Sequence, residues 1–159
     1  FRGNVDTRLK KLRDGVAAAT VLARAGLNRL GRTDVAGVSL SPEEFLPAVA
    51  QGIVTIESRE NDEEINLLVT ALGDVTTQYC VDAERALLFV LDGSCRTPIA
   101  GYAVYEATGL WLRGLVVAPD GSQAVAAERR GGAADAAAMG ADLGQELLAS
   151  GGSILAAIR

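Results

Sequence analysis

One cysteine, Cys95, lies in a short loop where a helical pattern ends and a strand pattern begins. Gly93 is expected to end the preceding helix in the left-handed conformation, which glycine adopts without a Cβ penalty. Pro98 fixes its own φ angle and favours an extended Thr97, so the loop has little freedom. The neighbouring Arg96 would favour the thiolate of Cys95, which is its nucleophilic form. The loop indicates either a directed, reactive thiol or a small apolar side chain that fills a helix–strand junction.

Basic side chains are concentrated at the start of the chain. The first 32 residues carry eight basic side chains against Asp6 and Asp14, a balance of +6, whereas the remainder has a balance of -11. A basic segment in an acidic protein indicates an anionic ligand. Phe1 is the only aromatic residue there, so the stacking side chains of a single-stranded nucleic-acid site are missing. A small polycarboxylate or phosphate is the better candidate.

Three arginines and one glutamine are the candidate ligands for such an anion. Arg2 and Arg8 flank the expected start of a helix, whose unpaired N–H groups and dipole favour negative charge. Guanidinium groups bind carboxylates in bidentate fashion, which lysine cannot do. The alternative is that these are solvated surface arginines and that Arg29 only snorkels at a helix end. Gln51 precedes Gly52, where the backbone could approach a ligand or where the chain could simply hinge.

Length and composition restrict the class of protein. A chain of 159 residues forms one ordinary domain or two small ones, and 49% hydrophobic with 22% charged residues is typical of a soluble, globular protein. No apolar run approaches the roughly 18 residues of a membrane span, and no cleavable leader opens the chain. Two cysteines and no histidine argue against a zinc site and a disulfide scaffold. These features favour a reducing cytoplasm.

The first half of the chain alternates between helix and strand patterns. Asn4 or Asp6 can cap a short helix that stops near Gly15. An apolar run over 20–23 is typical of a buried parallel strand, and a helical segment over 25–30 ends at Gly31. A helix start is expected at Ser41, then a strand over 53–59 and a helix after 61–64. This order predicts an α/β domain with a parallel sheet.

The second half predicts a small α+β domain. A helix is expected from about 74 to 92, with apolar residues at helical spacing. Three strands are expected over 99–107, 110–118 and 123–129, and the turn residues at 119–122 predict a hairpin between the last two. Asp135 is expected to open a final helix and Gly151 to close it. The sheet should be antiparallel and covered by helices.

Five single residues of this half are expected to have structural roles. Cys80 is expected to lie in the core, and Glu84 and Arg85 are expected to contact other elements. Trp111 and Arg113 are expected to pack in the core or to cover the surface.

The sequence resembles the porphobilinogen deaminase (hydroxymethylbilane synthase) family over nearly its whole length. The segment Gly93-Ser94-Cys95-Arg96-Thr97-Pro98-Ile99 is similar to the family's cofactor-attachment loop. Further similar blocks occur, in the same order along the chain, at residues 2–9, 25–31, 46–52, 83–85 and 119–122. The family usually has glycine at the position of Ala50, so the loop geometry there could differ. Several such blocks in one order are far more specific than any single motif.

The resemblance implies a fold in three parts. Residues 1–52 would be the second half of an α/β domain like that of periplasmic binding proteins, and residues 53–72 a strand and helix that return to a first domain. Residues 73–159 would be a C-terminal α+β domain that carries the cofactor cysteine. The N-terminal part of the family's proteins, with its catalytic aspartate and further lysine and serine ligands, has no counterpart in this sequence.

The resemblance also implies a function and a set of site residues. The family condenses porphobilinogen, with loss of ammonia, into a linear tetrapyrrole of the heme pathway. The growing chain is anchored through a dipyrromethane cofactor, here by a thioether to Cys95, with Arg2 and Arg8 as cofactor ligands. Arg29, Gln51 and Gly26 would bind substrate, and no catalytic residue would lie in this chain. The family is usually monomeric and cytoplasmic, without nucleic acid or membrane, but this piece could be inactive alone and could associate through open sheet edges.

Two other classes of function are compatible with parts of the sequence. A non-catalytic anion-binding module, resembling half of a solute-binding protein, agrees with the α/β pattern and the arginines but not with the cysteine loop. A transferase with a cysteine nucleophile agrees with Cys95 but lacks a histidine base.

Overall fold

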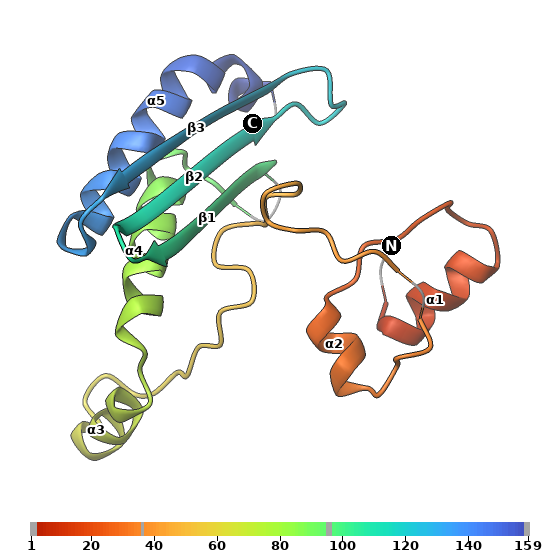
Figure 1. Cartoon of the computed structure of the whole chain (residues 1–159), viewed down its shortest axis with the longest axis horizontal. Coiled ribbons are helices and arrows are strands. Elements are labelled where there is room, and N and C mark those ends of the chain that lie inside the picture. Colours follow the sequence, from red (N-terminus) through yellow and green to blue (C-terminus); the bar gives the residue numbers. More distant parts are fainter. Residues whose placement is uncertain (1–2, 36, 95–96, 158–159) are drawn as a thin grey trace. The chain divides into compact units, whose positions relative to one another are not determined.

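The computed structural model describes residues 3–35, 37–94 and 97–157, and it divides the chain into two compact units, residues 1–40 and 41–159. The first unit holds helices α1 (Val5–Arg13) and α2 (Arg24–Arg29). The second holds α3 (Glu63–Ala71), α4 (Val75–Val90), β1 (Ile99–Glu106), β2 (Gly109–Val117), β3 (Ala124–Gly131), a 3-10 turn (Ala133–Asp135) and α5 (Ala136–Ala156). Figure 1 labels these elements.

Local sequence explains where the helices of the first unit begin and end. Asn4 caps α1, because its side-chain oxygen accepts the N–H of Thr7 at 2.9 Å. Of the two expected caps, Asn4 is therefore the one used. Gly15 follows α1 with φ of 74° and Gly31 follows α2 with φ of 63°, conformations that favour glycine. Both stops agree with the sequence prediction.

The second unit is built on a three-stranded antiparallel sheet in the order β1-β2-β3. Helices α4 and α5 cover one face of the sheet (Figure 1), and α4 and α5 also pack against each other. Leu87 on α4, Leu112 on β2, and Leu143 and Leu147 on α5 are completely buried between these layers. This arrangement confirms the predicted α+β architecture, including the hairpin between the last two strands.

The glycines of α5 make the helix pair possible. A Cβ on Gly140 would lie 2.1 Å from the backbone oxygen of Ala83, and one on Gly144 would lie 2.7 Å from Cβ of Val90. Both glycines are buried on the side of α5 that meets α4. Helix α5 also continues through Gly151, so the expected stop at that residue is wrong. Gly151 is buried against the sheet, where a Cβ would lie 3.6 Å from Val116, and this packing favours continuation of the helix.

Three expected elements are not formed in the described residues. Segments 20–23 and 53–59 are not strands, and Ser41 begins a turn rather than a helix. A strand needs a hydrogen-bonded neighbour, and the described part of the chain offers none to either segment. Val54 and Ile56 accordingly stay exposed. Helix α3 does form where expected, with Asp62 as its cap.

Candidate functional site

The cysteine loop is closed by hydrogen bonds on both sides. The N–H of Ser94 donates to the hydroxyl of Thr97, and the N–H of Thr97 donates back to the carbonyl of Ser94, both at 3.0 Å. Cys95 and Arg96 themselves lie outside the described residues. The described ends of this loop, at Ser94 and Thr97, thus lie within hydrogen-bonding distance of each other between α4 and β1.

The helix before this loop ends differently from the sequence prediction. Asp92, with φ of 50°, is the left-handed residue, and the N–H of Gly93 donates to the carbonyl of Leu88 at 3.0 Å. This bond pattern is that of a Schellman motif. Glycine suits position 93 for another reason, because a Cβ there would lie 2.3 Å from the end of the Leu88 side chain and 2.9 Å from that of Ile99, and these side chains would have to shift. Close packing, and not a positive φ angle, therefore favours glycine at position 93.

Arg8 lies on α1 and is half-buried. Its Nε donates to the carbonyl of Gly3 at 3.1 Å, so the start of the helix orients the side chain. No ion pair joins Arg8 to a carboxylate within the described residues. Arg2, the other expected cofactor ligand, lies outside the residues that the structure describes.

Gly26 and Arg29 lie on α2. Gly26 has open space where a side chain would be, because no atom lies within 4 Å of an added Cβ. Arg29 is exposed in the last turn of the helix and has no carboxylate partner in the part of the chain that the structure describes. Arg8 and Arg29 thus share a property that suits an anion-binding role, namely a guanidinium that no internal carboxylate neutralises.

Arg32, which the sequence does not single out, links the two helices of the first unit. It donates to Asp6 at 2.8 Å and to both carboxylate oxygens of Asp34, at 2.9 and 3.1 Å. The hydrogen bond with Asp34 raises the pKa of Arg32, and the same contact lowers the pKa of Asp34. Part of the positive charge of the basic segment is therefore neutralised by internal ion pairs.

Gln51 lies in a tight turn of the second unit. The N–H of Gln51 donates to the carbonyl of Ala48 at 3.0 Å, and that of Ile53 donates to the carbonyl of Ala50 at 3.2 Å. Ala50 has φ of 57°, in the left-handed region, and Gln51 is exposed.

A cavity of about 270 Å³ lies beside this turn, lined by Gln51, Cys80 and Tyr102 among others. Burial raises the pKa of the Cys80 thiol, and Cys80 is half-buried and packs against the core, where the sequence predicts it.

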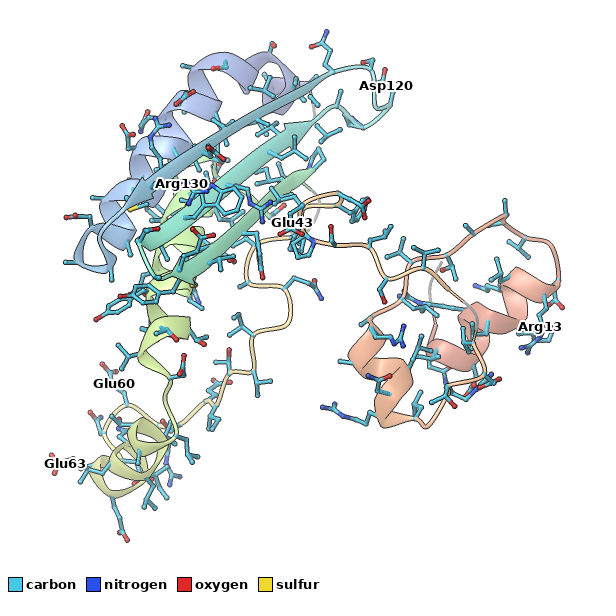
Figure 2. All side chains as sticks on the ribbon, in the orientation of Figure 1. Arg13, Glu43, Glu60, Glu63, Asp120 and Arg130 are labelled. Carbon is cyan, nitrogen blue, oxygen red and sulfur yellow. The ribbon has the colours of Figure 1, made fainter. Side chains whose placement is uncertain are left out.

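The face of the sheet that α4 and α5 leave uncovered carries an aromatic and arginine cluster. The guanidinium carbons of Arg113 and Arg130 each lie 4.2 Å from the ring centre of Trp111, within cation–π range. The indole N–H of Trp111 donates to Glu128, and Arg130 donates to Glu106. Figure 2 shows Arg130 on this open face. The cluster provides surface cover, as the sequence predicts for Trp111 and Arg113.

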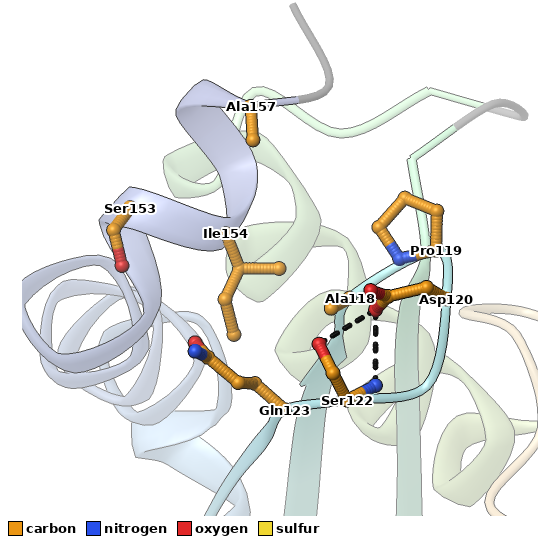
Figure 3. Close-up of a pocket in the computed structure, with 8 residues that line it drawn as sticks. All are labelled: Ala118, Pro119, Asp120, Ser122, Gln123, Ser153, Ile154 and Ala157. Atoms are coloured by element: carbon orange, nitrogen blue, oxygen red, sulfur yellow. Dashed lines mark hydrogen bonds between the residues drawn. The ribbon is translucent and has the colours of Figure 1, made fainter.

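A larger cavity, of about 500 Å³, lies between the β2–β3 turn and the end of α5 (Figure 3). Asp120 is turned toward Ser122, whose N–H and hydroxyl both donate to its carboxylate. These bonds lower the pKa of Asp120. Its carboxylate therefore serves the turn.

The described residues hold neither a metal-binding cluster of side chains nor a membrane-spanning helix. No group of three or more His, Cys, Asp or Glu side chains is placed to hold a metal ion in the described ranges. Within the same ranges, no helix combines the length and the apolar character needed to cross a lipid bilayer.

The chain matches known proteins in two adjacent regions. Residues 1–67 match the family model described as "Porphobilinogen deaminase, dipyromethane cofactor binding domain", and residues 78–149 match "Porphobilinogen deaminase, C-terminal domain". Proteins named Porphobilinogen deaminase from Paracoccus denitrificans and Nitrobacter hamburgensis are 56% and 53% identical over 147 residues, which is 92% of this chain. The chain spans about half the length of these relatives, 47% and 46%. From these matches, the chain belongs to the porphobilinogen deaminase family.

Proposed function

We propose that this chain is part of a hydroxymethylbilane synthase, a transferase that joins porphobilinogen units into a linear tetrapyrrole with loss of ammonia. The observation that carries the proposal is the agreement with proteins named Porphobilinogen deaminase over 92% of the chain, at 56% and 53% identity. The substrate and the growing pyrrole chain carry carboxylates, and the unpaired arginines of the first unit suit such ligands.

Residues of this chain fit a cofactor rich in carboxylates. Arg8 and Arg29 have no carboxylate partner among the described residues, whereas Arg32 has two. In our proposal, Cys95 holds the dipyrromethane by a thioether, and Arg2 and Arg8 bind its acidic side groups. The bound cofactor supplies the pyrrole carbon to which new units are added. Cys95 is then an anchor that is not consumed during turnover.

Substrate binding is assigned to Arg29, Gly26 and Gln51. Arg29 offers a bidentate fork for a carboxylate, Gly26 allows close approach to α2, and Gln51 offers an amide from an ordered turn. We assign no catalytic residue to this chain. The acid–base carboxylate is expected from the remaining half of the family's sequence, so that this chain contributes anchoring and binding.

The domain organisation that we propose follows the family resemblance. Residues 1–52 form the second half of an α/β domain of the periplasmic-binding-protein type, residues 53–72 a strand and helix of the first domain, and residues 73–159 the cofactor-carrying domain. The segments over 20–23 and 53–59 become strands only when neighbouring strands are present. The protein is expected to act as a monomer in the cytoplasm, where thiols such as Cys95 stay reduced, without nucleic acid or membrane.

The experiment that tests this function uses a chimera in which this chain replaces the matching segment of the Paracoccus denitrificans relative. We expect the chimera to form hydroxymethylbilane from porphobilinogen and to carry a covalent pyrrole adduct, visible as added intact mass and as colour with acidic aldehyde reagent. Cys95→Ser should abolish the adduct, whereas the matched control Cys80→Ser should keep it. An adduct of equal amount in Cys95→Ser would contradict the anchor, and a bare thiol without turnover would favour a non-catalytic anion-binding module.

A further inference from the structure

Glu84 is the one charged residue that is buried in the described part of the chain, with 5% of its surface exposed. It lies on α4, and its two carboxylate oxygens accept from two different segments. One oxygen accepts the N–H of Ala103 at 2.8 Å, and the other accepts the N–H of Ala50 at 2.6 Å. No ion pair with Glu84 occurs among the described residues. The carboxylate therefore serves backbone N–H groups.

One of these two hydrogen bonds, from Ala103, serves the open edge of the sheet, and the other, from Ala50, serves a neighbouring loop. Strand β1 is at the edge of the sheet, and its N–H groups on the outer side need partners other than a strand. The N–H of Gly101 donates to the carbonyl of Pro47 at 3.0 Å, and that of Ala103 donates to Glu84. Segment 47–50 is thus held along the edge of β1 at both of its ends, at one by Pro47 and at the other by the Glu84 carboxylate.

The bond to Ala50 holds a conformation that alanine rarely adopts. Ala50 has φ of 57°, where a Cβ is unfavourable. The next residue is Gln51, and the carbonyl of Ala50 accepts the N–H of Ile53 to close the turn. Gln51 and Glu84 both line the cavity of about 270 Å³ beside this turn. The direction in which Gln51 is presented therefore depends on the backbone of Ala50.

We propose that Glu84 is a positioning residue for Gln51. By accepting the N–H of Ala50, it keeps the left-handed turn formed and holds the Gln51 amide in place for the pyrrole chain. The inference rests on the proposed function, in which Gln51 binds substrate. A purely structural role, in which Glu84 only covers the edge of β1, would leave substrate binding unchanged once the protein is folded.

The first experiment measures amide hydrogen exchange in this chain. In Glu84→Gln the side chain keeps its volume but loses its charge and has one acceptor oxygen for two N–H groups, so we expect the amide of Ala50 to exchange about tenfold faster, as for loss of a charge-assisted bond. Glu146→Gln, the same change at an exposed carboxylate on α5, is the matched control. If Glu84→Gln fails to fold, Glu84→Asp keeps the charge but is too short to reach both segments. Unchanged exchange at the Ala50 amide would overturn the proposal, and faster exchange at Ala103 alone would favour a role in which Glu84 only covers the edge of β1.

The second experiment measures turnover of porphobilinogen in the chimera. Glu84→Gln should raise KM about tenfold with little change in kcat. The added substitution Ala50→Gly should restore KM, because glycine adopts the turn without the clamp. An unchanged KM, or no rescue by Ala50→Gly, would overturn the positioning role. If the unmutated chimera makes no product, the proposed function is contradicted instead, and the exchange experiment then decides whether Glu84 holds the turn.

Discussion

At the scale of single residues, the described arginines of the basic segment differ in whether a carboxylate of the chain pairs with them. Arg32 forms ion pairs with Asp6 and Asp34, which neutralise its charge locally. Among the described residues, the partner of the Arg8 side chain is the carbonyl of Gly3, which accepts from Nε and orients the side chain without neutralising its charge. Net charge alone would treat both residues alike, and the distinction comes from their partners.

The first prediction concerns Arg8. Arg8→Lys keeps the positive charge but removes the bidentate fork, so binding of a free dipyrromethane carboxylate should weaken by about 1.5–3 kcal/mol. Calorimetry on the Cys95→Ser chimera, which leaves the cofactor site open, measures this affinity. Arg13→Lys, an exposed position at the end of the same helix, is the control and should bind like the parent. Equal affinity of Arg8→Lys and Arg13→Lys would show that the fork is not used.

The second prediction concerns pH and two carboxylates with opposite shifts. Hydrogen bonds from Thr77 and Thr76 lower the pKa of Asp74 to about 2, whereas burial raises the pKa of Glu84. Ionised Asp74 therefore stabilises the fold at pH values above its ordinary pKa of 3.8, and this stabilisation is lost as the pH falls towards 2. Glu84 has the opposite effect, because the stability linked to its protonated form is lost as pH rises above its ordinary pKa of 4.5.

Urea unfolding between pH 2 and pH 7 measures both effects. Asp74→Asn keeps a capping oxygen without the charge, so stability should depend less on pH at the acidic end of this range. Glu84→Gln should instead reduce the loss of stability above pH 4.5. Acid dependence in Asp74→Asn equal to that of the parent would contradict the assignment to the α4 cap.

At the scale of elements, the packing of α4 on α5 gives the third prediction. Gly140→Ala would place a Cβ 2.1 Å from the backbone oxygen of Ala83, and backbone cannot move aside as a flexible side chain can. We expect a loss of at least about 1–3 kcal/mol in the free energy of unfolding. Gly152→Ala, on the same helix but with open space around the added methyl, is the control and should gain up to about 1 kcal/mol from helix propensity. Similar values for the two variants, measured by urea unfolding, would show that α4 and α5 do not approach so closely.

The same elements show what sequence can and cannot predict. The hairpin between β2 and β3 is predictable because its turn residues, Asp120 among them, act locally. The stop at Gly151 is wrong because a buried helix continues through a glycine that packs on the sheet, a contact between distant residues. Gly93 is correctly placed at a helix end but for the wrong reason, since Asp92 has the positive φ angle. Long-range contacts therefore decide where local patterns fail.

In the candidate site, too, local sequence patterns are predictive and contacts between distant residues are not. The resemblance of one motif singles out Cys95, and the excess of basic residues singles out Arg8 and Arg29. Neither pattern reveals that the N–H of Ala50 reaches a carboxylate 34 positions later in the chain. The sequence does predict that Glu84 contacts other elements, and the structure confirms this through Ala50 and Ala103. Which elements it joins could not be predicted, because that depends on the edge of a sheet formed later in the chain.

At the scale of the whole chain, the second unit buries one set of apolar side chains and leaves another set exposed. The core of residues 41–159 is closed between the sheet, α4 and α5. Other apolar side chains of the same unit stay exposed, including Val54 at 87%, Leu67 at 74% and Leu72 at 73%. Exposed apolar residues gathered in segments 53–56 and 65–72 favour association with another surface.

The last prediction is that the chain alone is catalytically inactive and associates with itself. The proposed function assigns this chain anchoring and binding but no acid–base carboxylate, so the purified chain should form no hydroxymethylbilane from porphobilinogen.

Sedimentation at micromolar concentration should show oligomers, because the apolar side chains of Val54 and Leu67 are exposed to solvent. Val54→Lys with Leu67→Lys should shift the chain toward monomer, whereas Phe89→Lys, at a single exposed position on α4 outside segments 53–56 and 65–72, should have a smaller effect. Amides before Gly73 should exchange faster than those of α4 and the sheet, since the described residues give segments 20–23 and 53–59 no strand neighbours. Turnover equal to that of the chimera, or strong protection before Gly73 in a proven monomer, would show that the isolated chain is complete in itself.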